Sequence, residues 1–285
     1  WNTTASWSTT SGGASGASVP GASDAAIFDG GNSMVGGVTV DATVSVVSIT
    51  ITSGYTGGGA NDGEINTGAY TITTSGALAM AAGKITRASG NLTIAANSIN
   101  NTGGSITTTT SGTIAINSTG TVGSFTLNTI TSVSTISIGS TTAPSAVTIN
   151  GTVSAGGIIS IYSNSDITQN AGITSNSGAS NVYFYPDVDN IGGAATFTRT
   201  SGVITANNTY FYFPASATTA FTLAGLDASA GTTNAIDIGI ATATSPVSVS
   251  ITGVVTSNSN IYIRSLGNIT QNADIDANSG ADNVS

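Results

Sequence analysis

Three pairs of acidic residues are the side chains of this sequence that could do acid–base chemistry. Each pair is spaced two residues apart, and the pairs are Asp62 with Glu64, Asp187 with Asp189, and Asp274 with Asp276. In a β-strand this spacing places both carboxylates on one face, where an acid and a base could act together on a glycosidic bond. Loop carboxylates at this spacing solvate a turn instead. We predict no catalytic residue and no enzymatic activity.

Metal and cofactor chemistry is restricted by what the sequence lacks. The chain contains no Cys and no His, which excludes disulfides, thiol nucleophiles, histidine bases and the usual zinc ligands. Carboxylate and amide oxygens suit a hard cation, so Asp187 and Asp189 are the candidate ligands for Ca²⁺. Neither an EF-hand spacing nor a Gly-Gly-x-Gly-x-Asp nonapeptide accompanies them, and no other cofactor is expected.

Two short aromatic strings could contact a partner. They are Tyr183-Phe-Tyr185-Pro186 and Tyr210-Phe-Tyr212-Phe-Pro214. Strand alternation sends some of these rings inward and the others to the surface, where a tyrosine can stack on a sugar or on a neighbouring protomer. Tyr183, Tyr185, Tyr210 and Tyr212 are therefore the candidate contacts for glycans or for self-association. Ordinary packing of inward rings between stacked strands is the alternative interpretation.

Composition and charge narrow the class of protein. Only 6% of the 285 residues are charged, the net charge is -9, and the four basic residues are too scattered to form a patch. Nucleic-acid binding is not expected, because an acidic chain repels phosphate backbones. No run of 18 apolar residues is present, so no membrane span is predicted. A mean hydropathy of +0.24 with regularly spaced Ile and Val favours a folded β protein over disorder.

An internal duplication shows how these residues are arranged. Residues 144–183 align without a gap on residues 246–285, an offset of 102, and twenty of the forty positions are identical. The apolar matches fall in pairs two residues apart, separated by short polar stretches, which predicts strand, turn, strand. A unit of this length would hold about five coils of about 20 residues each.

Stacking of such coils would bury one continuous column of Ile and Val and pair the backbone of each coil with its neighbours. Ser-Gly precedes an apolar strand position at Gly76, Gly90, Gly112 and Gly202, which predicts a tight corner repeated once per coil. Asn at equivalent turns, such as Asn170 and Asn272 or Asn181 and Asn283, either forms side-chain amide ladders or adopts left-handed turn conformations.

The amino-terminal part differs in character from the repeats. Both tryptophans, Trp1 and Trp7, lie there, and clean alternation begins at Val38 and continues to Ile51. Because an open terminal coil is an exposed sheet edge, we expect this part to act as a cap. The predicted domains are a cap with the first strands over residues 1–60, with the boundary at the glycines 57–59, and a β-solenoid over residues 61–285.

The repeat resembles a known family. Residues 151–193, GTVSAGGIISIYSNSDITQNAGITSNSGASNVYFYPDVDNIGG, and their copy from Gly253 resemble the repeats of filamentous-haemagglutinin-type adhesins and related giant bacterial surface proteins. The opening W-x5-W, V-P and D-A-A-I-F-D-G is similar to the amino-terminal segment of many secreted bacterial repeat proteins. The resemblance implies an all-β, right-handed parallel β-helix that is exported to the cell surface or beyond.

The functional expectation is therefore a structural or adhesive component of a secreted bacterial surface or biofilm-matrix fibre. Such a chain would self-associate or belong to a longer repeat array and would contact glycans or neighbouring cells. It begins at Trp1 without an apolar leader, as after removal of a signal peptide or in an internal fragment. Two alternatives stay open: an ice-binding solenoid that uses Thr-x-Thr strings such as Thr50-Ile-Thr52, and a polysaccharide-degrading β-helix.

Overall fold

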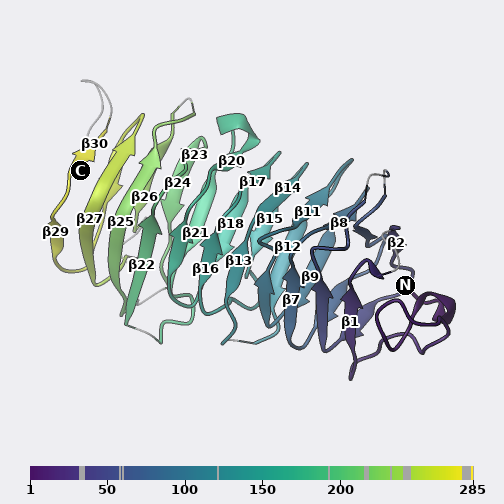
Figure 1. The fold of residues 1–285 in the computed structure, drawn as a ribbon. Helices are drawn as coiled ribbons and strands as arrows, with labels where there is room; N and C mark the ends of the chain where they lie inside the picture. Colours follow the sequence, from purple (N-terminus) through teal and green to yellow (C-terminus); the bar gives the residue numbers. More distant parts are fainter. Residues whose placement is uncertain are drawn as a thin grey trace.

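The computed structural model of the chain is a parallel β-solenoid, which confirms the all-β prediction (Figure 1). It describes residues 1–31, 36–57, 59, 61–120, 122–191, 193–214, 218–231, 233–239, 245–277 and 284. Within these residues, three parallel sheets build the stack, with 12, 8 and 10 strands, and the 8-stranded sheet ends at β23. We name them sheets A, B and C.

Each sheet takes one strand from each successive coil over most of its length. Sheet A contains β1 (Ala25–Phe28), β4 (Ser48–Ile51), β7 (Ala77–Met80), β10 (Ser98–Asn100), β13 (Phe125–Leu127), β16 (Val147–Ile149), β19 (Ile167–Gln169), β22 (Ala194–Arg199), β25 (Ala220–Ala228), β27 (Ser248–Ser257), β29 (Ile269–Gln271) and β30 (Ile275–Asp276). Sheet B contains β2 (Val38–Thr39), β5 (Glu64–Asn66), β8 (Lys84–Arg87), β11 (Ser105–Thr108), β14 (Thr129–Ser132), β17 (Val153–Ala155), β20 (Ile173–Ser175) and β23 (Ile204–Thr205).

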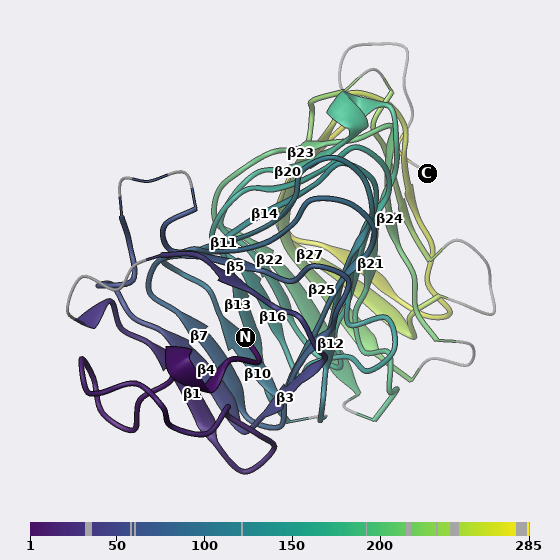
Figure 2. The ribbon, with the colours of Figure 1, turned by 90° about the vertical axis from the view of Figure 1, so that its right-hand side faces the viewer.

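Sheet C contains β3 (Val44–Val46), β6 (Ile72–Thr74), β9 (Leu92–Ala96), β12 (Ile114–Ser118), β15 (Ile136–Ile138), β18 (Ile159–Tyr162), β21 (Val182–Tyr185), β24 (Asn208–Phe211), β26 (Ala235–Ile238) and β28 (Ile261–Ile263). Two single-turn 3₁₀ helices, η1 (Thr4–Ser6) and η3 (Asn176–Gly178), complete the described elements. Viewed along the stack, the sheets form three sides of a coil (Figure 2).

The core is a column of apolar side chains from alternate positions of all three sheets. Sheet B supplies one large aliphatic side chain per coil, as in the register Ile85, Ile106, Ile130, Val153 and Ile173, and each of these is fully buried. Because the side chains of a strand alternate between its faces, the residues between the apolar ones point outward. The Ile and Val spacing in the sequence therefore specifies the inner face directly.

The coils are unequal in length, and the repeat spans fewer of them than predicted. Val147 pairs with Ile167, which is 20 residues later in the chain, and Ile167 pairs with Phe197, which is 30 residues later. In sheet A, β19, β22 and β25 lie between β16, which opens the first copy, and β27, which opens the second. The repeat unit therefore holds four coils and not five, because the intervening corners carry longer loops.

The Ser-Gly motif does not mark one recurring corner, so that prediction is wrong. Gly76 precedes a strand of sheet A, Gly90 and Gly112 precede strands of sheet C, and Gly202 precedes a strand of sheet B. Positive φ angles occur at Gly90, Gly112 and Gly202 but not at Gly76. Gly90 and Gly112 do stack, and a Cβ atom on Gly112 would lie 1.9 Å from the carbonyl oxygen of Gly90. The motif therefore recurs because several different corners need glycine.

Residues 1–24 lie against the first coil. The ring of Trp7 lies 5.0 Å from that of Trp1 and 5.7 Å from that of Phe28 on β1, measured between centroids. The indole Nε1 of Trp7 donates a hydrogen bond of 2.8 Å to the carbonyl of Trp1. These contacts cover the end of the apolar column. Strand β1 already pairs with β4, so coil stacking begins before Val38. The boundary near residue 60 stays a prediction, and residues 58 and 60 lie outside the described residues.

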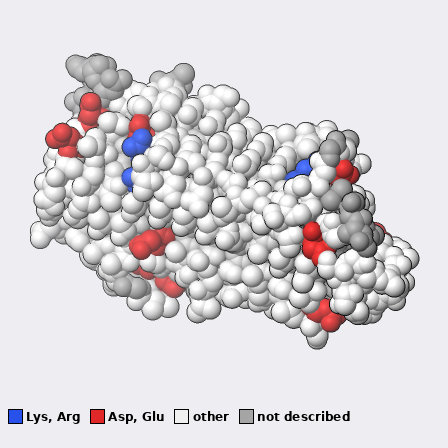
Figure 3. All heavy atoms as spheres, in the orientation of Figure 1, with Lys and Arg blue, Asp and Glu red and all other residues white. Residues whose placement is uncertain are grey.

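Charged side chains are confined to the two ends of the solenoid. No Asp, Glu, Lys or Arg occurs between Arg87 and Asp166. On the face shown in Figure 3, the middle of the molecule is accordingly free of charge. The polar groups that the coils from β9 to β18 present to water are therefore hydroxyl, amide and backbone groups. Within the described residues, no helix has the length and apolar character needed to cross a membrane.

Candidate functional site

The first acidic pair is divided between a turn and a sheet. The backbone N–H of Gly59 donates to Oδ2 of Asp62 over 2.8 Å, so this carboxylate closes a turn. Glu64 lies on β5, where its Oε2 is 3.3 Å from Nζ of Lys84, its register partner on β8. The hydroxyl of Thr86 donates to the other oxygen of Glu64. Both carboxylates thus have structural partners within and between coils.

The predicted calcium ligands follow β21 but face different environments. Asp187 is buried with a φ of 55°, a left-handed conformation that Asp tolerates, and its Oδ2 accepts a hydrogen bond from the hydroxyl of Thr219. Asp189 is exposed, and its Oδ1 accepts the N–H of Ile191 over 3.2 Å. One carboxylate therefore joins two coils while the other closes a turn. Calcium binding at these residues stays a prediction.

The third pair lies on the last described coil. Asp274 and Asp276 are both exposed, and the carbonyl of Asp274 accepts the N–H of Val255 over 3.0 Å. Among the described residues, no group of three or more acidic, His or Cys side chains is close enough together to hold a metal ion.

The tyrosines of the two aromatic strings form a stacked ladder on the outer face of sheet C. Phe184 and Phe211 point inward and are fully buried, while the tyrosines beside them are only partly buried. The ring of Tyr183 stacks on that of Tyr210 with centroids 5.1 Å apart and planes at 13°. A second column adds Tyr162, which the sequence did not single out. We call Tyr162, Tyr183, Tyr185, Tyr210 and Tyr212 the tyrosine ladder.

The second column of the ladder has the closest stacking. Tyr162 on β18 and Tyr185 on β21 are register partners, and their rings are 4.1 Å apart with planes at 4°. Tyr185 then stacks on Tyr212 at 5.3 Å and 12°. Burial, followed by the neighbouring Tyr162, raises the pKa of Tyr185 above its ordinary value, and burial also raises the pKa values of Tyr210 and Tyr212. These three phenols therefore stay neutral at physiological pH.

This geometry changes what the tyrosines can offer to a partner. The faces that two stacked rings turn toward each other are covered, and Tyr185 is covered by a ring on both faces, so a sugar cannot stack on those faces as it would on a lone exposed tyrosine. Ring edges, hydroxyl groups and the outer faces of the end rings are the parts that can meet a partner. The ladder is thus a surface for hydrogen bonds and edge contacts. Glycan or protomer contact at Tyr183, Tyr185, Tyr210 and Tyr212 stays a prediction.

Outward hydroxyl groups form columns on sheets A and B, which the comparison of the two repeat copies did not reveal. In sheet B, five stacked positions carry a hydroxyl: Thr107, Thr131, Ser154, Thr174 and Thr205. Sheet A carries a second column of four: Thr126, Thr148, Thr168 and Thr198. Within the described part of the chain, no hydrogen bond engages any of these nine hydroxyl groups. We call the two sets the threonine columns.

The stacked hydroxyl groups come from residues of adjacent coils. The comparison of the two repeat copies, at an offset of 102 residues, therefore did not align them. Thr148 stacks on Thr168 of the very next coil, whereas the duplication compares positions that lie four coils apart. Stacked strands are about 4.8 Å apart, and alternate outward residues of one strand are about 7 Å apart. Pairs such as Ser105 and Thr107, stacked on Thr129 and Thr131, therefore form a regular grid of hydroxyl groups.

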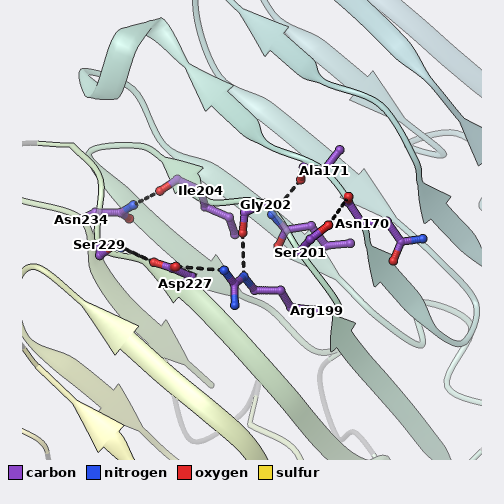
Figure 4. A network of polar contacts seen from close by, with 10 residues as sticks. Asn170, Ala171, Arg199, Ser201, Gly202, Ile204, Asp227, Ser229 and Asn234 are labelled. Carbon is purple, nitrogen blue, oxygen red and sulfur yellow. Dashed lines mark hydrogen bonds and ion pairs between the residues drawn. The ribbon is translucent and has the colours of Figure 1, made fainter.

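A polar network joins three coils at the corner between sheets A and B (Figure 4). Nη2 of Arg199 is 2.9 Å from Oδ2 of Asp227, and Nε of Arg199 donates to the carbonyl of Gly202 over 2.6 Å. Burial alone would raise the pKa of Asp227, but hydrogen bonds from Ser229 and the charge of Arg199 together lower it. The pair sits where the chain turns and stabilises the corner.

Asparagine side chains are hydrogen-bonded between coils at two corners. Of the two interpretations of these residues, the side-chain ladder is therefore the correct one. Nδ2 of Asn170 donates to Oδ1 of Asn150 over 2.7 Å, and Nδ2 of Asn207 donates to Oδ1 of Asn181 over 3.3 Å. Neither Asn170 nor Asn181 has a positive φ angle. These amides therefore connect coils and do not serve as left-handed turn residues. Asn283 lies outside the described residues.

Comparison with known proteins gives no relative to weigh against this geometry. Neither a protein-family model, nor a curated protein, nor a solved structure matches the chain.

Proposed function

We propose that the chain is a structural or adhesive segment of a secreted bacterial surface or extracellular-matrix fibre, similar to the filamentous-haemagglutinin type. The observation that carries the proposal is the unbroken column of buried apolar residues that runs from β1 to β28, within one continuous stack. Each coil adds about 4.8 Å of length, whatever the length of its loops, and each coil inside the stack is hydrogen-bonded to the coil before it and the coil after it. Such a stack is a stiff rod, which a fibre requires.

The exterior supports the same proposal. The coils between Arg87 and Asp166 carry no charge, so rods can approach one another side by side without electrostatic repulsion along this stretch. The tyrosine ladder adds a line of ring edges and hydroxyl groups suited to contact with glycans or with another rod. Adhesion and lateral association would thus use different parts of one solenoid.

Immunogold electron microscopy of the producing bacterium tests this proposal. Antibodies raised against residues 1–285 are expected to label fibres on or outside the cell. Labelling confined to the cell interior would overturn it. The adhesive part is tested by binding of the chain to immobilised glycans, where Tyr210→Ser is expected to lower binding and Tyr70→Ser, outside the ladder, to leave it unchanged.

A second function, ice binding, is favoured by the threonine columns. Ice-binding solenoids need a flat, regular grid of outward threonines, and sheets A and B supply hydroxyl columns in register over four and five coils. Their free hydroxyl groups and methyl groups could order water at the coil spacing. The first three positions of the sheet B column and the first two of the sheet A column lie in the uncharged stretch.

Thermal hysteresis of the purified chain separates this function from the fibre role. An ice-binding face predicts measurable hysteresis that falls sharply in Thr131→Lys, because a long charged side chain would interrupt the grid. Ser137→Lys is the matched control, since Ser137 points outward from sheet C in the same coil. Absence of hysteresis in the unmodified chain would exclude ice binding and leave the fibre proposal intact.

A further inference from the structure

The closest ring pair of the tyrosine ladder has a geometry suited to covalent coupling. Tyr162 and Tyr185 project in the same direction from neighbouring parallel strands, and their rings are 4.1 Å apart and nearly parallel at 4°. We propose that this pair is an oxidative cross-linking site, at which a haem peroxidase with hydrogen peroxide joins the two rings as dityrosine. The bond would staple β18 to β21 across adjacent coils.

The chemistry is balanced by one molecule of peroxide. Each phenol gives one electron and one proton to the oxidant, and the peroxide takes up two electrons and two protons to become two molecules of water. The two phenoxyl radicals then join through a carbon ortho to each hydroxyl, and the ring hydrogen at each joined carbon moves to the oxygen to restore the phenol. The protein therefore loses two hydrogen atoms and gains one carbon–carbon bond.

The register of the sheet favours coupling within the chain over coupling between chains. Because the strands are parallel and in register, the rings of Tyr162 and Tyr185 lie face to face across the stack. A second radical formed on this pair has its partner already in place, which is the advantage of an intramolecular reaction.

Other tyrosines lack this combination. Tyr183 with Tyr210 and Tyr185 with Tyr212 are stacked less closely, at 5.1 Å and 5.3 Å. Tyr70 is exposed, and among the described residues no aromatic ring packs on it. With no cysteine in the chain, tyrosine is the side chain that can form an oxidative covalent staple here. The inference is independent of the fibre role, since it needs only the ladder and an oxidant.

The test is to oxidise the purified chain with a haem peroxidase and hydrogen peroxide and to identify the cross-linked peptides by mass spectrometry. We expect dityrosine fluorescence in a species that stays monomeric on a denaturing gel, and a joined peptide containing Tyr162 and Tyr185 that is lighter by two hydrogen atoms. Tyr162→Phe keeps the ring stack and should lose this peptide. Tyr70→Phe is the control and should retain it.

Three results would overturn the assignment. They are dityrosine found only between chains, coupling through Tyr183 with Tyr210 or Tyr185 with Tyr212 in place of Tyr162 with Tyr185, and no dityrosine at all while the unmodified chain retains its β-sheet circular dichroism. A Tyr185→Phe variant gives an independent check, since it should lose the same peptide as Tyr162→Phe.

Discussion

Strands β19 and β29 carry the same sequence, Ile-Thr-Gln, in the two copies of the repeat, yet their side chains meet different surroundings. Ile167 on β19 is 0% exposed, whereas its counterpart Ile269 on β29 is 50% exposed. The backbone bonds to the preceding coil are alike, since Asn170 and Asn272 each donate a 2.8 Å bond to an isoleucine carbonyl. What differs is the next coil: β22 pairs with β19, and no described strand continues sheet A beyond β29.

The comparison shows that burial in this fold comes from the neighbouring coil and not from the local sequence. A strand bonded on one side only keeps its register but loses the cover over its inward residues. Because the two strands have the same sequence, the same substitution can be made in both copies. The difference between the two losses of stability then measures what the covering coil contributes.

The largest expected effect is on the inward isoleucines. Ile167→Ala should lower the free energy of unfolding by about 2–5 kcal/mol, because it leaves a cavity in a fully packed column. Ile269→Ala should lower it by less than about 1 kcal/mol, since this side chain is half exposed already. Chemical denaturation measures both. Equal losses would show that the last coil is covered in solution.

Hydrogen exchange compares the two strands without a mutation. The amides of Asn170 and Asn272 make equivalent bonds, but we expect the amide of Asn272 to exchange at least about a hundredfold faster, because a terminal coil opens without unfolding the rest. Exchange followed by mass spectrometry or NMR checks this. Similar protection at both sites would argue against local opening of the last coil.

The two glutamines should differ by a smaller amount. Gln169 is 0% exposed and its Nε2 donates to the carbonyl of Ala171 over 3.0 Å, whereas Gln271 makes the same bond at the surface. Gln169→Ala should destabilise by about 1–3 kcal/mol, because the part-buried carbonyl of Ala171 loses its donor and the buried side chain of Gln169 is removed. Gln271→Ala should change stability by less than about 0.5 kcal/mol. The thermal unfolding midpoints of the two variants, compared with the unmodified chain, give the result.

The smallest expected effect is the pH dependence of stability that arises from Asp227 and Asp237, which lie in the coils between the two repeat copies. The pKa of Asp227 is lowered in the fold, so its contribution to stability is present above about pH 4 and is lost as the pH falls through the folded value. Burial outweighs the attraction of Arg264 and raises the pKa of Asp237, so ionisation of this carboxylate reduces stability as the pH rises through the folded value.

Unfolding free energies measured from acid to neutral pH test both signs. Asp227→Asn should reduce the loss of stability that occurs as the pH falls. Asp237→Asn should remove the loss of stability that occurs as the pH rises through the pKa of Asp237. If both variants changed the curve in the same direction, the assigned balance of burial and charge at one of the two residues would be wrong.

Local patterns in the sequence were sufficient for the inner face of the solenoid. Alternating Ile and Val predict which residues point inward, because strand alternation is a local property of the backbone. The placement of Phe184 and Phe211 inside the coil follows in the same way. The predicted number of coils per repeat was wrong, because the loops between the strands differ in length and the sequence has no regular period from which to count coils.

The outer surface depends on register between coils, and the step along the chain from one coil to the next is not constant. No comparison at one fixed offset can align Thr126, Thr148, Thr168 and Thr198, so the threonine columns emerge only in three dimensions. Tyr162 joined the ladder for the same reason, because Tyr185 meets it as a register partner in the adjacent coil and not through the duplication.

By itself, the sequence determined the fold class, the inward residues and the absence of thiol and imidazole chemistry, because these follow from composition and from alternation along each strand. The tertiary structure decided which outward residues stack, which acidic side chains are bonded between coils, and which of two identical strands is buried. Those properties belong to pairs of coils, whose spacing in sequence is irregular while their spacing in space is constant.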